Sequence, residues 1–238
     1  MPGKRKKINC PAGVCAVIVA AGSSQRMGGD NKLLLELAGT PLLVHTLGAF
    51  ERCDVVRDIV LVCREQDILP YTTLARSAGI SKLYAVVRGG DSRTTSALAG
   101  LEAAPADTAL VAVHDGARPL VSEVLIAEAV YAAAEHGAAA PVVPVKDSIK
   151  RIENGRITAD VARDTLAAVQ TPQVFRRALL ERALSDAARA GRTYTDDCAA
   201  VEAYGQPVFV THGSYQNIKI TTPEDLLIAQ AFLQGEAD

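Results

Sequence analysis

Residues 14–32 read VCAVIVAAGSSQRMGGDNK, an apolar run followed by a glycine-rich loop. A continuous apolar run of this length is typical of a strand that is buried on both faces. The glycines let backbone N–H groups approach an anion closely, and Arg26 and Lys32 add two positive charges. The loop matches neither the dinucleotide-binding nor the ATPase P-loop pattern. It therefore predicts a phosphate site of unspecified kind, while a plain strand-to-helix turn remains an alternative.

Apolar runs alternate with amphipathic segments along the rest of the chain. We expect strands at Val14–Ala20, Ile59–Val62, Leu83–Val87, Ala109–Val113, Ala139–Val145 and Val208–Thr211. We expect helices at Pro41–Glu51, Gln66–Ser77, Ser92–Ala103, Ser122–Glu135, Arg176–Ala190 and Pro223–Leu233. This order predicts an α/β fold, a Rossmann-like three-layer sandwich with a mostly parallel sheet. Ligands of such sheets bind beyond the carboxyl ends of the strands.

Glycine and polar residues follow directly after the expected strands. We therefore expect them to meet at one edge of the sheet and to form the site there. They are Gly89-Gly90-Asp91-Ser92-Arg93, His114-Asp115-Gly116-Ala117-Arg118-Pro119, Lys146-Asp147-Ser148 and Asn217-Ile218-Lys219.

One segment interrupts the alternation. Residues 146–163 hold Asn154-Gly155 between two short β-like runs, which is the strongest local signal for a hairpin. Few apolar residues flank the turn, so we expect a protruding arm that needs a partner to be stable. We predict a homodimer in which each arm embraces the other subunit, although a free surface hairpin is an alternative. Residues 1–238 are then a single domain with this dimerisation arm.

The composition excludes several classes of protein. The net charge is −2, aromatic residues make up 4% and tryptophan is absent, so neither a basic field nor stacking platforms for nucleic acid are expected. The five cysteines show no C-x-x-C spacing, which indicates reduced thiols and a cytoplasmic protein. The apolar run near the N-terminus is too short to span a bilayer, so no membrane segment is expected.

Asp115 is the candidate metal ligand. A carboxylate at the end of a buried strand suits Mg²⁺, which takes one or two protein carboxylates and completes its shell with phosphate oxygens and water. Asn217 is a possible second oxygen ligand, and Arg118 offers a planar fork that matches phosphate. A turn-forming role for Asp115 and a surface ion pair for Arg118 are the structural alternatives. His114 we interpret as a structural histidine.

The cationic residues exceed what one nucleotide triphosphate requires. They are Arg26, Lys32, Arg118, Arg163 and Lys219. A second phosphorylated substrate would use the surplus, which predicts nucleotidyl transfer: an acceptor phosphate attacks the α-phosphorus of a nucleotide and pyrophosphate leaves. A phosphate dianion is already nucleophilic, so positioning and charge stabilisation matter more than a general base.

The order of these motifs resembles the 2-C-methyl-D-erythritol 4-phosphate cytidylyltransferase family. The matching positions are Ala20-Ala21-Gly22, Arg26-Met27, Asn31-Lys32, Gly89-Gly90-Asp91-Ser92-Arg93, Ser96, His114–Pro119, Pro144–Lys150, Gln170-Thr171-Pro172-Gln173, Thr195-Asp196-Asp197, Asn217–Thr221 and Pro223–Leu226. The resemblance implies transfer of a cytidylyl group from CTP to methylerythritol phosphate in isoprenoid precursor synthesis, with Mg²⁺ as cofactor.

The resemblance also implies roles for single residues. Arg26 and Lys32 would stabilise the α-phosphate in the transition state, and Arg163 and Lys219 would be further catalytic residues. The nucleoside would be held by Ala20, Ala21, Gly22, Gly90, Asp91 and Ser96. The remaining substrate-binding residues would be Asp115, Arg118, Ser148 and Thr171, with Ser148 and Arg163 on the arm that reaches the partner's site.

Two other functions fit the same residues. One is a cytidylyltransferase that acts on a sugar-alcohol phosphate such as ribitol 5-phosphate, since the fold would be the same. The other is a regulatory module that binds the nucleotide without catalysis. Arg26 and Lys32 argue against the second, because a sensor would not need both charges at the transition state.

Overall fold

The fold is built on one large sheet, and the computed structural model describes residues 13–22 and 31–235. The strands of the sheet are β1 (Val14–Val19), β4 (Asp58–Cys63), β5 (Leu83–Arg88), β6 (Leu110–Asp115), β7 (Ala138–Pro144), β10 (Ala167–Val169), β11 (Gln173–Arg176) and β12 (Phe209–His212). Their order is β10-β7-β11-β6-β1-β4-β5, and β12 pairs with β7. β10 and β11 run antiparallel to their neighbours and the other pairings are parallel. The prediction of a mostly parallel sheet is confirmed.

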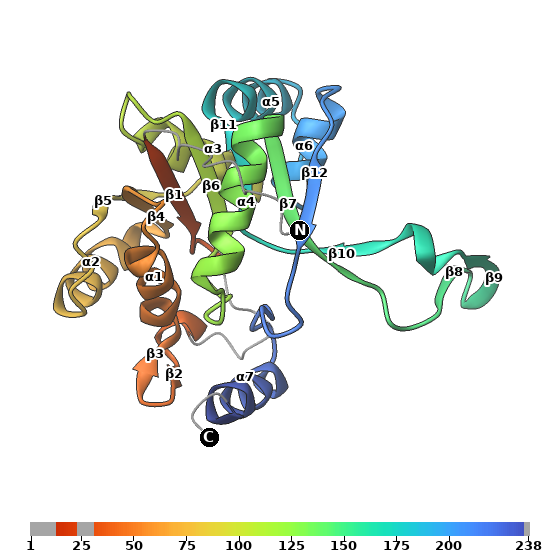
Figure 1. The fold of residues 1–238 in the computed structure, drawn as a ribbon, viewed down its shortest axis with the longest axis horizontal. Helices are drawn as coiled ribbons and strands as arrows, with labels where there is room; N and C mark the ends of the chain where they lie inside the picture. Colours follow the sequence, from red (N-terminus) through yellow and green to blue (C-terminus); the bar gives the residue numbers. More distant parts are fainter. Residues whose placement is uncertain (1–12, 23–30, 236–238) are drawn as a thin grey trace, which may run out of the picture.

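Helices cover both faces of this sheet (Figure 1). One face carries α1 (Leu42–Arg52), α2 (Ile68–Ser77) and α4 (Glu123–His136), and the other carries α3 (Arg93–Ala103), α5 (Arg177–Arg189) and α6 (Asp197–Ala203). Ala16 and Ile18 of β1 pack in the first core, whereas Cys15 and Val17 pack in the second. Successive strand side chains point to opposite faces, so an all-apolar strand fills two cores at once.

The first turns of the helices follow from local chemistry. The Ser122 side chain accepts a hydrogen bond from the Leu125 N–H at the start of α4, as an N-cap serine does. Ser92 and Thr95 form a reciprocal capping box at the start of α3. α3 is the next element after β5, and α4 is the next element after β6. The two caps therefore fix the starts of helices that follow the carboxyl ends of strands.

The C-terminal helix α7 (Pro223–Gly235) lies apart from the two main cores. It packs on a small cluster that includes Leu37, Leu42 and Ile220. Leu37 belongs to the short strand β2 (Glu36–Leu37), which pairs with β3 (Thr40–Pro41). Because Ile220 lies in this cluster, the segment 217–221 is held across the edge of the sheet.

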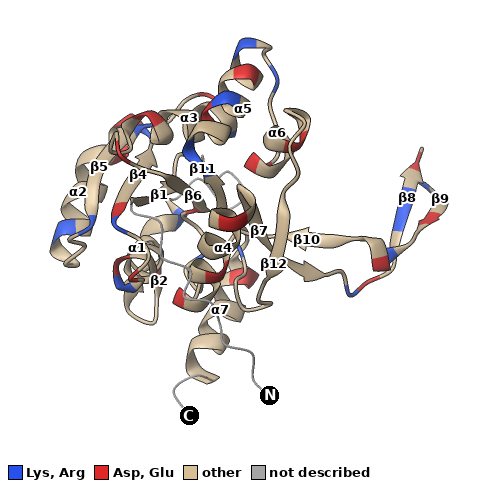
Figure 2. Cartoon of the chain, turned by 45° about the horizontal axis from the view of Figure 1, so that its top comes forward, with Lys and Arg blue, Asp and Glu red and all other residues tan. Residues whose placement is uncertain are grey.

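The arm is a separate two-stranded hairpin of β8 (Ile149–Glu153) and β9 (Arg156–Val161) that extends away from the sheet (Figure 1). Asn154 and Gly155 have φ angles of 51° and 74°, as the predicted tight turn requires. Ile152 and Ile157 form a cross-strand pair and are 67% and 68% exposed. Figure 2 marks residues of both charge signs along the same hairpin. The protruding arm is therefore confirmed, and two of its largest apolar side chains face outward.

Residues 167–176 were not expected to be strands. They run antiparallel along β7 as β10 and β11, with a break at residues 170–172, where the Gln170 N–H donates to the Pro141 carbonyl. The seven-residue helix α6 was also missed. The break matters for the site because it brings Thr171 against the end of β6.

Two simpler expectations can be compared with the described residues. Their cysteines, Cys15, Cys53, Cys63 and Cys198, are free, in line with the predicted reduced thiols, and all four are buried. Within residues 13–22 and 31–235, none of the helices has the length and apolar character needed to cross a membrane.

Candidate active site

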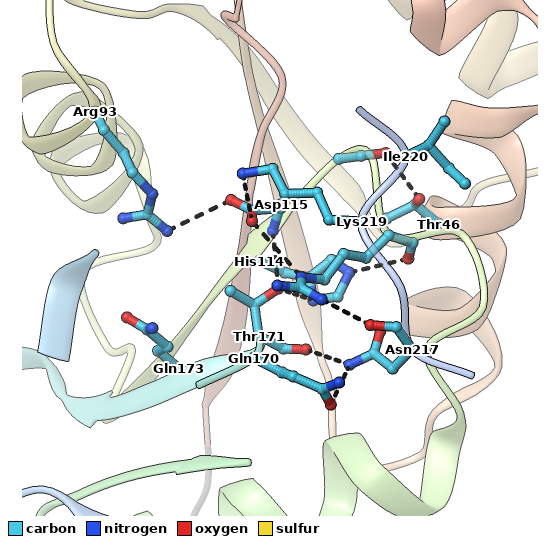
Figure 3. Close-up of polar contacts among 12 residues, drawn as sticks. Thr46, Arg93, His114, Asp115, Gln170, Thr171, Gln173, Asn217, Lys219 and Ile220 are labelled. Atoms are coloured by element: carbon cyan, nitrogen blue, oxygen red, sulfur yellow. Dashed lines mark hydrogen bonds and ion pairs between the residues drawn. The ribbon is translucent and has the colours of Figure 1, made fainter. Parts of the chain in front are cut away.

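The centre of the candidate site is Asp115, the last residue of β6. Its side chain is only 12% exposed and lies among three cations (Figure 3). The Lys219 ammonium is 2.9 Å from Oδ2, an Arg93 nitrogen is 3.5 Å from Oδ1, and Arg118 Nε is 3.7 Å from Oδ2. Burial alone would raise the pKa of Asp115, but Lys219, Arg93 and Arg118 lower it to about 2. The carboxylate is therefore ionised at neutral pH.

A buried ion pair stands behind this carboxylate. Arg93 is the first residue of α3, and its guanidinium lies 2.5 Å from the carboxylate of Asp197, whose side chain is 1% exposed. Arg93 thus bridges Asp197 and Asp115. The sequence motifs contained both residues, but no role was assigned to either. The available signal was a cation at the first position of a helix, where the helix dipole disfavours positive charge.

A chain of hydrogen bonds fixes the backbone of Asp115. Its N–H donates to Thr171 Oγ1 at 3.2 Å, and the Thr171 hydroxyl lies 3.0 Å from His114 Nδ1. His114 Nε2 lies 3.2 Å from the Arg118 carbonyl, which can only accept, so Nε2 carries the proton and Nδ1 accepts from Thr171. Burial lowers the pKa of His114 to about 3. His114 is a neutral structural residue, as predicted, and in this structure the Thr171 hydroxyl supports Asp115.

Asn217 ties the opposite side of the site together. Its side-chain N–H₂ donates to the Thr171 carbonyl at 2.9 Å, and its own backbone carbonyl accepts from Arg118 at 2.7 Å. The side chain is fully buried, and Oδ1 has no hydrogen-bond partner among the described residues. The structure does not favour Asn217 as an oxygen ligand of a metal, because that oxygen is buried in the protein interior.

Lys32 reaches the same segment from the glycine-rich side. Its ammonium donates to the Ile220 carbonyl at 2.8 Å, one residue from Lys219. Asn31 caps the short 3-10 turn Lys32–Leu34, since its Oδ1 accepts from the Leu33 N–H at 3.3 Å, and Oδ1 also accepts from the Tyr71 hydroxyl at 2.8 Å. Lys32 and Lys219 thus approach one edge of the sheet from two directions. Arg26 lies outside the described residues.

The residues expected to hold a nucleoside gather beside β1, β4 and β5. The Ala20 N–H donates to the Val62 carbonyl at 2.7 Å, and Ser96 Oγ donates to the Gly90 carbonyl at 3.2 Å. A Cβ placed on Gly89 would lie 2.8 Å from both the Ala21 Cβ and Ser96 Oγ. The backbone at Gly89 therefore approaches Ala21 and Ser96 as closely as a residue without a side chain allows. Gly22, Gly90 and Asp91 are exposed nearby.

The two arm residues are not part of this cluster. Ser148 and Arg163 are exposed, and Arg163 donates to the Lys146 carbonyl at 2.8 Å within the base of the arm. The Lys146 ammonium in turn lies 3.7 Å from the centre of the Tyr215 ring. The base of the arm is thereby anchored to the segment that carries Lys219, while its tip extends away.

A magnesium ion has a restricted donor set at this edge. Within the described residues there is no group of three or more His, Cys, Asp or Glu side chains that could hold a metal. Asp115 can offer a carboxylate, and Lys219, whose side chain is 42% exposed, can turn toward an incoming phosphate. One carboxylate together with phosphate and water oxygens fits the ordinary coordination of Mg²⁺. The residues therefore fit a metal that arrives with the nucleotide.

The carboxyl edge of this Rossmann-like sheet brings the glycine turns after β1 and β5 together with a cluster of lysine and arginine side chains. These are features of a nucleotidyltransferase. The 2-C-methyl-D-erythritol 4-phosphate cytidylyltransferase family profile (IspD) matches residues 14–235. The chain belongs to this family.

Single relatives agree with the profile. The cytidylyltransferase of that name from Desulforamulus reducens is 47% identical over 93% of this chain and 96% of its own length. The one from Bacillus licheniformis is 44% identical over 92% and 95%. Among solved structures, the Thermus thermophilus enzyme has a TM-score of 0.77 at 34% identity and covers 92% of this chain and 98% of its own. The Anaerococcus prevotii 4-diphosphocytidyl-2C-methyl-D-erythritol synthase has a TM-score of 0.82 at 31% identity, over 93% and 98%.

Proposed function

We propose that this chain transfers a cytidylyl group from CTP to 2-C-methyl-D-erythritol 4-phosphate and releases pyrophosphate. The observation that carries the proposal is the set of three cations around Asp115, with the Lys32 ammonium on the adjacent Ile220 carbonyl. Two phosphorylated substrates must come together in this reaction, and one positive cluster at the edge of the sheet suits both. Membership of the family supplies the identity of the nucleotide and of the acceptor.

The reaction we infer is an in-line displacement. The phosphate of the acceptor attacks the α-phosphorus of CTP, a new P–O bond forms, and the bond to the bridging oxygen of pyrophosphate breaks. Lys32 and Arg26 stabilise the charge on the α-phosphate, and Lys219 contributes from the acceptor side. His114 is buried and neutral, so it is not a base, and the acceptor phosphate needs none.

The substrate-binding roles follow the two halves of the site. We propose that Ala20, Ala21, Gly22, Gly90, Asp91 and Ser96 hold cytosine and ribose. The acceptor would be held by Asp115, Arg118 and Thr171 of one subunit and by Ser148 of the partner subunit. The Thr171 hydroxyl also supports Asp115. The four-amino group of cytosine is a hydrogen-bond donor, so backbone carbonyls and carboxylates of the first group can distinguish it from uracil.

Mg²⁺ would be held by Asp115 together with the phosphates of CTP. When bound, it neutralises phosphate charge and polarises the phosphoryl group. Lys219 must then exchange its contact with Asp115 for one with a phosphate, which its exposure permits.

The arm, residues 146–163, is proposed to complete the partner's site in a homodimer. Ile152 and Ile157 are exposed on a two-stranded hairpin, and such a hairpin is marginally stable alone. Arg163 and Ser148 would then act in the partner's site. We retain the single-domain organisation over 1–238 and a cytoplasmic location as parts of this proposal.

Pyrophosphate release in the presence of CTP and Mg²⁺ tests the function, with methylerythritol phosphate and ribitol 5-phosphate compared as acceptors. Release with methylerythritol phosphate supports the proposal. Release with ribitol 5-phosphate alone identifies the sugar-alcohol alternative, and binding of CTP without release with either acceptor identifies a regulatory module.

A further inference from the structure

Neither residue of the ion pair between Arg93 and Asp197 has a catalytic or substrate-binding role in the proposed function. Both groups are withdrawn from solvent, with side chains 20% and 1% exposed, and their charged atoms are 2.5 Å apart. Arg93 stands at the first position of α3, where the exposed backbone N–H groups disfavour a cation. A residue chosen only for helix stability would be acidic or neutral there. Contacts outside α3 must therefore account for an arginine at this position.

Asp197 is itself held rigidly. Its backbone N–H and that of Cys198 both donate to Gln173 Oε1, at 2.9 and 3.0 Å. Gln173 is a buried residue of β11, which pairs with β6. The preceding residue, Asp196, caps α6 through the Ala199 N–H. Asp197 is thus fixed to the same part of the sheet that ends in Asp115.

Arg93 connects the fixed carboxylate of Asp197 to the carboxylate of Asp115. One of its terminal nitrogens faces Asp197. The other lies 3.5 Å from Asp115 Oδ1 (Figure 3). Lys219 and Arg118 lie on the other oxygen, Oδ2. The carboxylate is therefore oriented from one side by Arg93, while its second oxygen stays with the groups that meet substrate.

We propose that Arg93 and Asp197 form a positioning pair that sets the orientation of Asp115 for the acceptor substrate. The inference rests on the proposed function, because it takes Asp115 to be the acceptor-binding carboxylate. Neither residue of the pair needs to touch the acceptor. Loss of Asp197 would leave Arg93 free to turn wholly toward Asp115, and loss of Arg93 would leave Asp115 to Lys219 and Arg118.

The test uses full-length Asp197→Asn and Arg93→Met enzymes, with KM determined separately for methylerythritol phosphate and for CTP. Asp197→Asn keeps the size of the side chain and removes the charge. Each variant should raise the KM for the acceptor by about tenfold. At saturating Mg²⁺ the KM for CTP should change by no more than about twofold, because phosphate and water oxygens supply most of the ligands of the metal. The KM for the acceptor should be no higher in the double variant than in Arg93→Met alone, because Asp197 acts through Arg93. Arg93→Lys keeps the charge but loses the planar fork, so its KM for the acceptor should lie between those of wild type and Arg93→Met. It replaces Arg93→Met in the test if that variant does not fold.

Asp107→Asn is the matched control. Asp107 accepts two hydrogen bonds from Arg57, each 2.7 Å long, at the amino end of the strands, and its loss should leave both KM values unchanged. Parallel increases in both KM values, additive effects in the double variant, or an unchanged acceptor KM would each overturn the inference. If wild type itself shows no turnover with methylerythritol phosphate, it is the proposed function that fails, so the two failures are distinct.

Discussion

The Lys219 ammonium lies 2.9 Å from Oδ2 of Asp115, a carboxylate that is almost wholly buried. The two residues come from opposite parts of the chain, one from the end of a central strand and the other from the segment before the last helix. Their contact joins the end of β6 to the segment that also receives Lys32. It also makes the charge of Asp115 depend on Lys219.

The pH dependence of stability should report this contact. The pKa of Asp115 is lowered from 3.8 to about 2, so its ionised form stabilises the fold above pH 3.8, and this stabilisation is lost as the pH falls toward 2. Lys219→Met removes the largest favourable partner and should reduce the free energy of unfolding at neutral pH. Urea unfolding should show that the difference from wild type shrinks between pH 3.8 and 2.

Lys146→Met is the control for that experiment. The Lys146 ammonium faces the Tyr215 ring at 3.7 Å rather than a carboxylate. Its effect on stability should not change over the same acid range. A constant difference for Lys219→Met would mean that Lys219 does not set the pKa of Asp115.

Thr171→Val should destabilise the protein. The change removes the hydroxyl that accepts from the Asp115 N–H and donates to His114, and leaves two buried polar groups without partners. Each unsatisfied buried group costs roughly 1–3 kcal/mol, so the free energy of unfolding in urea should fall by at least about 1 kcal/mol. Thr171→Ser keeps the hydroxyl and should lose less. An unchanged stability of Thr171→Val, or a larger loss in Thr171→Ser than in Thr171→Val, would show that the hydroxyl does not stabilise the fold.

Lys32→Ala should separate binding from catalysis. We expect CTP affinity, measured by calorimetry, to stay within about tenfold of wild type, while turnover falls by several orders of magnitude, because the charge stabilises the transition state more than the ground state. Lys82→Ala is the matched control, since the Lys82 ammonium also donates to a backbone carbonyl, that of Cys53 at 2.9 Å, but before β5. Equal losses of affinity and turnover in Lys32→Ala would make it a ground-state phosphate ligand.

Mixed dimers test whether the arm completes the partner's site. Arg163→Ala and Lys32→Ala subunits should each be nearly inactive alone. After unfolding and refolding together in equal amounts, about one site in four would combine an intact Lys32 with an intact arm, so about a quarter of wild-type activity should return. Absence of recovery, with heterodimers verified by mass spectrometry, would place Arg163 in the site of its own chain.

The sequence predicted the long elements well because their signals are local. The apolar run of β1 and the Ser122 cap of α4 lie within a residue or two of their predicted positions. β11 and α6 were missed because they have four and seven residues, too few for a period to show. β11 is a strand only because β6 and β7 lie on either side of it.

The site shows the same difference between local signals, which could be predicted, and long-range contacts, which could not. Asp115 and Lys219 could be predicted because each follows directly after an apolar run or precedes a helix at the expected edge. Arg93 and Asp197 could not be paired, since 104 residues separate them. Their contact arises because α3 packs against α5 and α5 packs against α6. Thr171 was assigned to substrate, but its hydrogen bonds to Asp115 and His114 depend on the break between β10 and β11.

Phosphorus NMR of the reaction mixture tests the central claim most directly. With CTP, methylerythritol phosphate and Mg²⁺, the enzyme should convert both substrates into a diphosphate diester and pyrophosphate in equal amounts. Lys32→Ala should form neither at a comparable rate. Hydrolysis of CTP without diester, or diester formed only from ribitol 5-phosphate, would contradict the assignment of the acceptor and of the reaction.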